Sequence, residues 1–171
     1  MKMENSNRVK KEGGKSIKEN TAGCFTIVMN QKGYILLAKR KDYPLWDLHG
    51  GTLEEGEELA ICAIRETQEE TGYSISIKKK IGEYYKPQYN DVEHLFLGRL
   101  EGGSPIDEGP ETKEVRWFHP RKLPLNMIPN RRKQIRNYLK FRGEIVKKSL
   151  RVSPAKIFFY KGFLRVFGKY L

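Results

Sequence analysis

The sequence predicts a single mixed α/β domain, because strand-like segments lie on both sides of one central amphipathic helix. The chain has 171 residues, enough to bury a core without disulfides. Apolar residues make up 38% and charged residues 32%, which excludes a chain that is disordered throughout. No run approaches about 18 consecutive apolar residues, so no transmembrane helix is expected.

The first half of the chain predicts a hairpin followed by a helix. Residues 1–20 contain almost no apolar side chains and predict a disordered tail. Apolar runs at 24–29 and 34–38, joined by a tight turn, predict a β-hairpin. Residues 57–71 predict a helix, which Gly72 ends in the left-handed cap position.

The second half predicts three further strands and a helix. Alternating apolar residues over 73–81 indicate a half-buried strand. Apolar runs predict two more strands, within 93–100 and over 115–118. A helix is expected over 131–142, with Asn130 as its N-cap. Strands before and after the central helix thus complete the mixed α/β class.

The two cysteines, Cys24 and Cys62, lie in apolar runs and cannot form a disulfide framework. We therefore expect buried free thiols and a reducing compartment. The N-terminus also lacks the apolar stretch of a signal peptide. A cytoplasmic location is expected.

The net charge of +12 arises entirely at the end of the chain. Residues 1–130 are neutral, whereas residues 131–171 contain 13 basic residues and one acid, Glu144. We expect residues 144–171 to form a basic extension with an amphipathic helix over 153–170. This helix could pack on its own domain or form a homodimer, and the alternatives are an anionic membrane surface or RNA.

Three carboxylates of the central helix point to metal chemistry. Glu66, Glu69 and Glu70 are spaced i, i+3 and i+4, so they share one face near the end of the helix. They repel one another there, and the helix dipole disfavours them. A divalent cation would remove both penalties, and oxygen ligands suit Mg²⁺ or Mn²⁺. The alternative is a solvated acidic face.

The surrounding residues, GGTLEEGEELAICAIRETQEETGY over positions 50–73, resemble the Nudix box. That motif has fixed glycine, glutamate and arginine positions at set spacings, and all seven occur here. They are Gly51, Glu57, Arg65, Glu66, Glu69, Glu70 and Gly72. Thr67 and Tyr73 stand where aliphatic residues are usual.

The flanking residues extend this resemblance over about residues 21–143. Residues 46–51 are similar to the family's Trp-x-x-Pro-Gly-Gly lead-in, with His49 in place of proline. An acidic loop followed by a Trp-containing strand also resembles the family. The resemblance implies the Nudix fold, a mixed sheet sandwiched between helices, and metal-dependent hydrolysis of a nucleoside triphosphate or of a nucleoside diphosphate linked to another moiety.

The resemblance also implies roles within the box. The metal ligands would be Glu66, Glu69 and Glu70, with a carbonyl of Gly51 or its neighbour Gly50. Arg65 lies one helical turn before Glu69 and can orient its carboxylate. We interpret Glu57 as structural.

The general base and the substrate contacts are less tightly specified. For the base we expect Glu111 outside the box, with Glu114, Glu108, Asp107 or a box glutamate as alternatives. Candidate substrate-binding residues are Arg40, Trp46 and His49. Trp46 could instead pack in the core, and Arg40 could be a solvated surface residue. Alternative functions are RNA-end hydrolysis and nucleotide or RNA binding without turnover.

Overall fold

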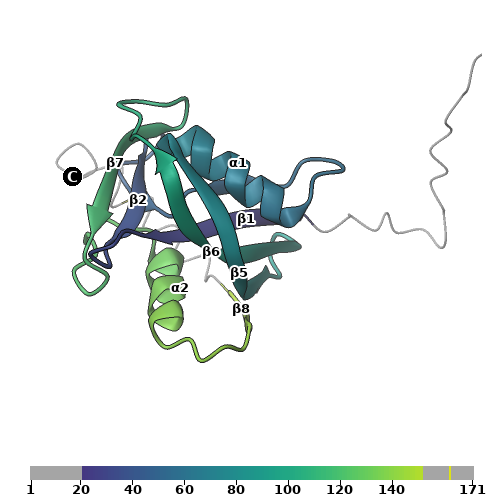
Figure 1. Cartoon of the computed structure of the whole chain (residues 1–171). Coiled ribbons are helices and arrows are strands. Elements are labelled where there is room, and N and C mark those ends of the chain that lie inside the picture. Colours follow the sequence, from purple (N-terminus) through teal and green to yellow (C-terminus); the bar gives the residue numbers. More distant parts are fainter. Residues whose placement is uncertain (1–20, 152–161, 163–171) are drawn as a thin grey trace, which may run out of the picture.

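The structure is a computed structural model that describes residues 21–151 and residue 162. Figure 1 shows the described part as one twisted sheet flanked by two helices. In chain order the elements are β1 (Thr21–Met29), β2 (Ile35–Arg40), β3 (Trp46–Asp47), β4 (Gly50–Thr52), α1 (Leu59–Thr71), β5 (Tyr73–Lys86), β6 (Asp91–Gly103), β7 (Thr112–Phe118), α2 (Pro129–Leu139) and β8 (Val146–Ser149).

The strands form one mixed sheet, ordered β3-β2-β1-β6-β5-β8, with β4 paired to β1 and β7 paired to β2. β1 runs parallel to β6 and β8 runs parallel to β5, while the other strand pairs are antiparallel. The central strand β1 therefore joins the N-terminal hairpin to the long hairpin formed by β5 and β6.

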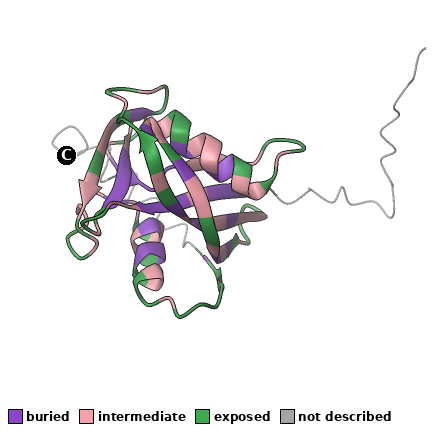
Figure 2. Ribbon diagram, in the orientation of Figure 1, coloured by how far each residue is buried: buried purple, intermediate pink, exposed green. Residues whose placement is uncertain are grey.

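The two helices cover opposite faces of this sheet, as the alternation of residues along β1 requires. Cys24 packs against Cys62 and Ala63 of α1. Ile27 belongs to the larger cluster that contains Ile135 of α2. Figure 2 shows the buried residues along the central strands and on the helix sides that face them. The predicted α/β sandwich is confirmed, and so is the burial of both free thiols.

Helix α1 begins at Leu59, later than the expected Glu57. Glu58 is the N-cap and has extended backbone angles, so Glu57 lies outside the helix. The strands β5 and β6 are longer than the expected ranges 73–81 and 93–100. They pair along their whole length with three register shifts, and these irregularities interrupt the simple alternation on which the prediction depended.

Helix α2 also differs from the expected range 131–142, because it spans Pro129–Leu139. Proline suits the first turn of a helix, since its missing N–H would have no helical partner there. The N-cap is consequently Ile128 rather than Asn130.

Strand β8 lies beyond residue 143, where we expected the domain to end, and it belongs to the same sheet. The apolar side chains of Val146 and Leu150 join the main core cluster, which explains how a basic segment can add a strand. The expected tail 1–20 lies outside the described residues, and so does the expected helix over 153–170 apart from residue 162. Within the described residues, no helix is long and apolar enough to cross a membrane.

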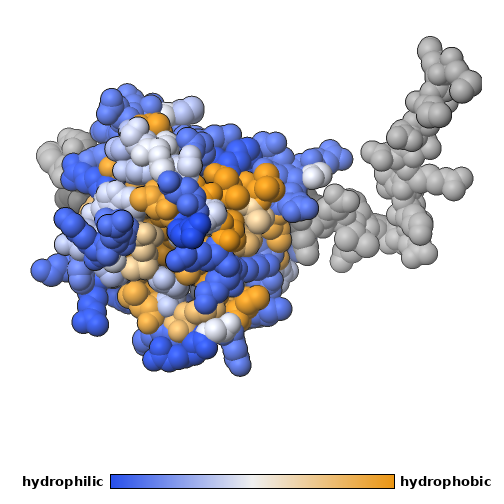
Figure 3. Space-filling model, in the orientation of Figure 1, coloured by the Kyte–Doolittle hydropathy of each residue, from blue (hydrophilic) through white to orange (hydrophobic). Residues whose placement is uncertain are grey.

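The surface mixes apolar and charged side chains. In the face shown in Figure 3, apolar residues gather at the centre, over α1, β5 and β6, among charged ones. Ile61 of α1 is 53% exposed. The predicted homodimer, membrane and RNA contacts of residues 144–171 remain predictions, because most of that segment lies outside the described residues.

Candidate active site

Helix α1 presents the box residues to one side of the sheet because its other face is packed. Cys62, Ala63, Thr67 and Thr71 are its buried residues. Gly72 ends the helix with φ +77°, and a Cβ there would lie 2.3 Å from the Ser104 carbonyl oxygen. The glycine therefore permits the sharp passage from α1 into β5.

Arg65 is the centre of an ion-pair network. Its Nε and a terminal nitrogen (Nη2) donate to the two oxygens of Glu57 at 2.8 and 3.0 Å. Its other terminal nitrogen (Nη1) contacts Glu66 at 2.9 Å and Glu69 at 3.2 Å. The expected contact between Arg65 and Glu69 is present, but the bidentate partner is Glu57. Hydrogen bonds from Arg65 lower the pKa of Glu57 to about 2, so this carboxylate stays charged.

The glycine pair lies directly against two of the carboxylates. The Gly50 amide donates to Glu70 Oε2 at 2.9 Å. A Cβ on Gly51 would lie 2.4 Å from Glu66 Oε1, and a Cβ on Gly50, whose φ is +148°, would lie 2.1 Å from the Cys24 carbonyl oxygen. A side chain at Gly51 would therefore displace the loop from α1, and a side chain at Gly50 would displace it from β1.

Burial controls the protonation of these carboxylates. It raises the pKa of Glu70 to about 8, and the negative charges of Asp47, Glu66 and Glu111 add to this effect. Burial also raises the pKa of Glu66, against the opposing influence of Arg65. Glu69 is the accessible member of the set, with its side chain 59% exposed.

The expected metal ligands share a helix face but are turned toward other partners. Glu66 and Glu69 face Arg65, while Glu70 faces the Gly50 amide. Among the residues that the structure describes, no three acidic, histidine or cysteine side chains are grouped as a metal-binding set. A cation bound by all three carboxylates would therefore share them with Arg65 and the Gly50 amide.

A cavity of about 390 Å³ opens beside the glycine pair. The cavity lies between β1, the box loop (residues 48–52, which include β4), and parts of β2, β3, β5, β6 and α2. Its lining consists of Thr21, Ala22, Gly23, Phe25, Arg40, Asp47, Gly50, Gly51, Thr52, Lys86, Asp91, Glu111 and Arg131. Two residues that the sequence predicted as functional from outside the box, Arg40 and Glu111, therefore lie on the same cavity.

The floor of the cavity is a buried charge cluster centred on Arg131 of α2. Arg131 contacts Asp47 at 2.9 Å and Glu93 at 2.7 Å, and its guanidinium lies 3.4 Å from the ring centroid of Phe25. Lys86 pairs with Glu93 at 2.5 Å. Burial raises the pKa of Asp47. Burial acts likewise on Glu93, but the charges of Arg131 and Lys86 outweigh it and lower the pKa of that carboxyl.

Sequence reasoning missed these cluster residues. Asp47 stands between Trp46 and Leu48, and large apolar neighbours are a local sign that a charged side chain is buried. Glu93 stands between Val92 and His94 in a long strand, so this sign is weaker there. That sign does not reveal the partner, because Arg131 is 84 residues from Asp47 along the chain.

The structure places Trp46 and His49 in the core rather than in the cavity. Trp46 is 5% exposed and packs edge-on against Phe118, with ring centroids 4.7 Å apart. His49 is completely buried, and its Nδ1 contacts Thr67 Oγ1 at 2.9 Å. Burial lowers the pKa of His49 to about 3, so the ring is neutral. Neither side chain lines the cavity, because Trp46 packs on Phe118 and the His49 ring contacts Thr67 of α1.

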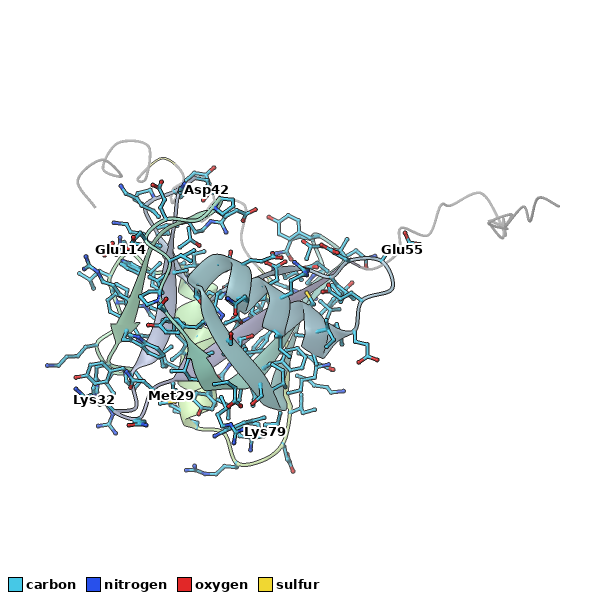
Figure 4. All side chains as sticks on the ribbon, turned by 45° about the horizontal axis from the view of Figure 1, so that its top comes forward. Met29, Lys32, Asp42, Glu55, Lys79 and Glu114 are labelled. Atoms are coloured by element: carbon cyan, nitrogen blue, oxygen red, sulfur yellow. The ribbon has the colours of Figure 1, made fainter. Side chains whose placement is uncertain are left out.

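The acidic candidates after the box lie in different places. Glu111 is exposed at the cavity wall, just before β7. Glu114 lies on β7, where it pairs with Arg116, and Figure 4 shows it at the margin of the molecule, away from α1. Glu108 pairs with Lys41 at 2.7 Å. Of these three acids, only Glu111 lines the cavity.

Known proteins are similar to this chain in sequence. A family profile described as the NUDIX domain matches residues 18–138. A protein of Bacillus subtilis (strain 168), provisionally named an 8-oxo-dGTP diphosphatase, is 48% identical over 118 residues, which cover 69% of this chain and 79% of that protein. An ADP-ribose pyrophosphatase of Methanocaldococcus jannaschii is 30% identical over 123 residues, covering 68% and 72%.

Solved structures show the same fold. A NUDIX hydrolase from Nitrosomonas europaea has a TM-score of 0.69 at 24% identity, covering 80% of this chain and 82% of that one. A mutator MutT protein from Bacillus halodurans has a TM-score of 0.62 at 19% identity, covering 79% and 92%. With the profile match and the complete box on α1 and the preceding loop, this chain belongs to the Nudix hydrolase family and is a pyrophosphohydrolase of that divalent-metal-using group.

Proposed function

We propose that the protein hydrolyses oxidised purine nucleoside triphosphates, with 8-oxo-dGTP as the substrate to test first. The observation that carries this proposal is the position of the cavity, which begins at the box glycines and ends at the charge cluster around Arg131. Its volume of about 390 Å³ is within the range of small-ligand sites. A nucleotide could thus place its phosphates at the box and its base over the cluster. The 48% identical relative with this provisional name supports the same substrate.

The cavity offers the hydrogen-bonding groups that a guanine base needs. Guanine presents N–H donors beside a carbonyl acceptor. Asp47 supplies an acceptor: its Oδ1 accepts from Arg131, and its Oδ2 lies 4.0 Å from Arg40, beyond hydrogen-bond distance. Lys86 supplies a donor on the same cavity. Oxidation at C8 adds one more carbonyl and one more N–H, so a mixed set of charged groups suits the oxidised base.

The residues of the box fit a divalent metal. Carboxylate and carbonyl oxygens are the ligands that Mg²⁺ or Mn²⁺ prefers, and the missing Cβ of Gly51 leaves its backbone against the Glu66 carboxylate. Glu66, Glu69, Glu70 and the Gly51 carbonyl would hold it. When bound, the metal would neutralise phosphate charge and lower the pKa of a water molecule.

The chain's own residues then divide the remaining work. Arg65 would orient Glu66 and Glu69 through its existing contacts, and Arg40 would contact a phosphate. Glu111 would accept the proton of the attacking water. It lies at the cavity wall, and its charge contributes to the raised pKa of Glu70, so it is close to the box carboxylates.

A substrate panel tests this proposal. Pyrophosphate release from 8-oxo-dGTP, dGTP and a 5′-triphosphate RNA, and hydrolysis of ADP-ribose, would be measured with Mg²⁺ and with Mn²⁺. We expect the highest kcat/KM for 8-oxo-dGTP, and Asp47→Asn should reduce its advantage over dGTP. A higher kcat/KM for ADP-ribose or RNA would overturn the substrate assignment, and full turnover by Glu70→Gln would overturn the metal site.

A nucleotide-pool substrate and two buried free thiols fit a cytoplasmic enzyme.

A further inference from the structure

The two residues that depart from the family pattern at the loop and in the helix are in direct contact. His49 stands where the lead-in motif has proline, and Thr67 stands where the box has an aliphatic residue. Their side chains meet at 2.9 Å, and both are completely buried. The two departures therefore form one interaction, which joins the box loop to α1.

The hydrogen bonds define the direction of this contact. Thr67 Oγ1 donates its proton to the Ala63 carbonyl oxygen at 2.7 Å. It must then accept from His49 Nδ1, which carries the ring proton of the neutral imidazole. The His49 carbonyl oxygen also accepts the Thr26 amide of β1 at 3.1 Å. His49 is thereby tied to the sheet by its backbone and to α1 by its ring.

A second link between loop and helix lies next to the first. Gly50 follows His49, and its amide donates to Glu70, three residues after Thr67. Residues spaced by three share a helix face and are about 4.5 Å apart along the axis, while one extended residue advances about 3.3 Å. The loop thus runs beside α1, and the contact of His49 with Thr67 fixes the separation at which Gly50 meets Glu70.

We propose that His49 and Thr67 form a positioning pair that holds the Gly50 amide on Glu70 and thereby sets the orientation of this carboxylate for metal binding. The proposal rests on the proposed role of Glu70 as a metal ligand. In the family pattern, a proline and an aliphatic side chain would fix the same separation by backbone restriction and packing. The Thr67 hydroxyl should therefore be dispensable only when His49 is replaced as well.

The single variants should differ in their effects. Thr67→Val keeps the shape but leaves the buried Nδ1 proton without an acceptor, so the loop should move away from α1. We expect Mn²⁺ binding to weaken about 10–100-fold, as for other residues that orient metal ligands. His49→Pro leaves Thr67 bonded to Ala63 and should have a smaller effect. The double variant His49→Pro/Thr67→Val should recover Mn²⁺ affinity to within about threefold of the wild type.

Two measurements separate positioning from general stability. In the metal-free protein, the NMR shift and the exchange rate of the Gly50 amide proton report its bond to Glu70. Mn²⁺ dissociation constants come from electron paramagnetic resonance titration. Thr71→Val is the matched control, since Thr71 is also buried in α1 and bonds to the carbonyl of residue 67 but does not contact His49. It should leave both readouts unchanged.

The inference is overturned if Thr67→Val leaves the Gly50 amide and Mn²⁺ affinity unchanged, or if the effects of the two substitutions simply add in the double variant. Thr67→Ser keeps the hydroxyl and must behave as the wild type, so weakened Mn²⁺ binding in this variant would also contradict the pair. Unchanged Mn²⁺ affinity in Glu70→Gln would contradict the proposed metal site instead. The Gly50 amide shift in Thr67→Val would still test the positioning pair.

Discussion

The buried charge cluster makes a strong prediction about stability. Replacing Arg131 by methionine keeps an unbranched apolar side chain over Phe25 but removes the cation between Asp47 and Glu93. Both carboxylates are almost completely buried. Lys86 still contacts Glu93, whereas Asp47 keeps the hydrogen bond from the Leu48 amide, at 2.8 Å, and the distant Arg40, at 4.0 Å. The substitution therefore leaves buried negative charge without its main partner.

The expected cost follows from the lost contacts. Two charge-assisted hydrogen bonds, to Asp47 at 2.9 Å and to Glu93 at 2.7 Å, each contribute about 1.5–3 kcal/mol. Removing one partner from a buried ion pair costs about 3–5 kcal/mol, in agreement with this sum. We expect the free energy of unfolding to fall by about 3–5 kcal/mol at pH 7 in Arg131→Met.

The pKa directions of the two carboxyls predict how the loss of stability in Arg131→Met depends on pH. In the native protein the pKa of Glu93 lies below its unfolded value, so its contribution is present at neutral pH and is lost as pH falls through the folded pKa. The raised pKa of Asp47 acts in the opposite sense, and its contribution declines as pH rises. Without Arg131, burial should raise the pKa of both carboxyls. The deficit of the variant should therefore be smaller at pH 5 than at pH 7.

Urea unfolding at pH 5 and pH 7, followed by circular dichroism, measures both effects. Lys133→Met is the matched control, because Lys133 is exposed on the same helix, and its change should stay within about 0.5 kcal/mol. A loss below about 1 kcal/mol in Arg131→Met at pH 7, or a deficit that grows at pH 5, would refute the reasoning.

Three further predictions concern the box and the cavity wall. Gly51→Ala introduces a Cβ at 2.4 Å from the Glu66 carboxylate, so Mn²⁺ binding should weaken at least about tenfold in a titration; unchanged affinity would contradict the close approach. Glu111→Gln should lower kcat about 10²–10⁴-fold with little change in KM, while Glu114→Gln, whose carboxylate pairs with Arg116, should retain activity; the reverse ranking in steady-state assays would exclude Glu111 as the base. In the metal-free protein the Glu70 pKa is about 8, so this carboxyl must lose a proton to bind a cation. Mn²⁺ affinity should therefore fall about tenfold per pH unit below about pH 8, and a flat profile between pH 6 and pH 8 would count against it.

Much of the box was predictable because its information is local. The spacing of Arg65 and Glu69 places them one turn apart on any helix, and their contact is present at 3.2 Å. Gly72 ends that helix with the expected positive φ. The same local reasoning placed the start of α1 at Glu57, where the structure has a side chain that leaves the helix and binds Arg65.

Side-chain direction in short segments was not predictable in this way. Trp46 and His49 both neighbour the glycine pair, yet their side chains are buried on the core side of the loop. In a two-residue strand, alternation is too short to indicate which face is buried. The pairing of β3 with β2, at Lys39 and Trp46, sets which face of β3 is buried.

The sequence by itself determined the helix that carries the three carboxylates, the glycines that approach it, and the arginine that pairs with two of them, because these depend on spacings of a few residues. Only the tertiary structure decided that a cavity lies beside them, that Asp47 and Arg131 line it, and that Glu93 pairs with Arg131. These residues come from three elements far apart in the chain. They meet through the parallel pairing of β1 with β6 and the packing of α2, contacts whose register depends on the folding of the whole domain rather than on local sequence.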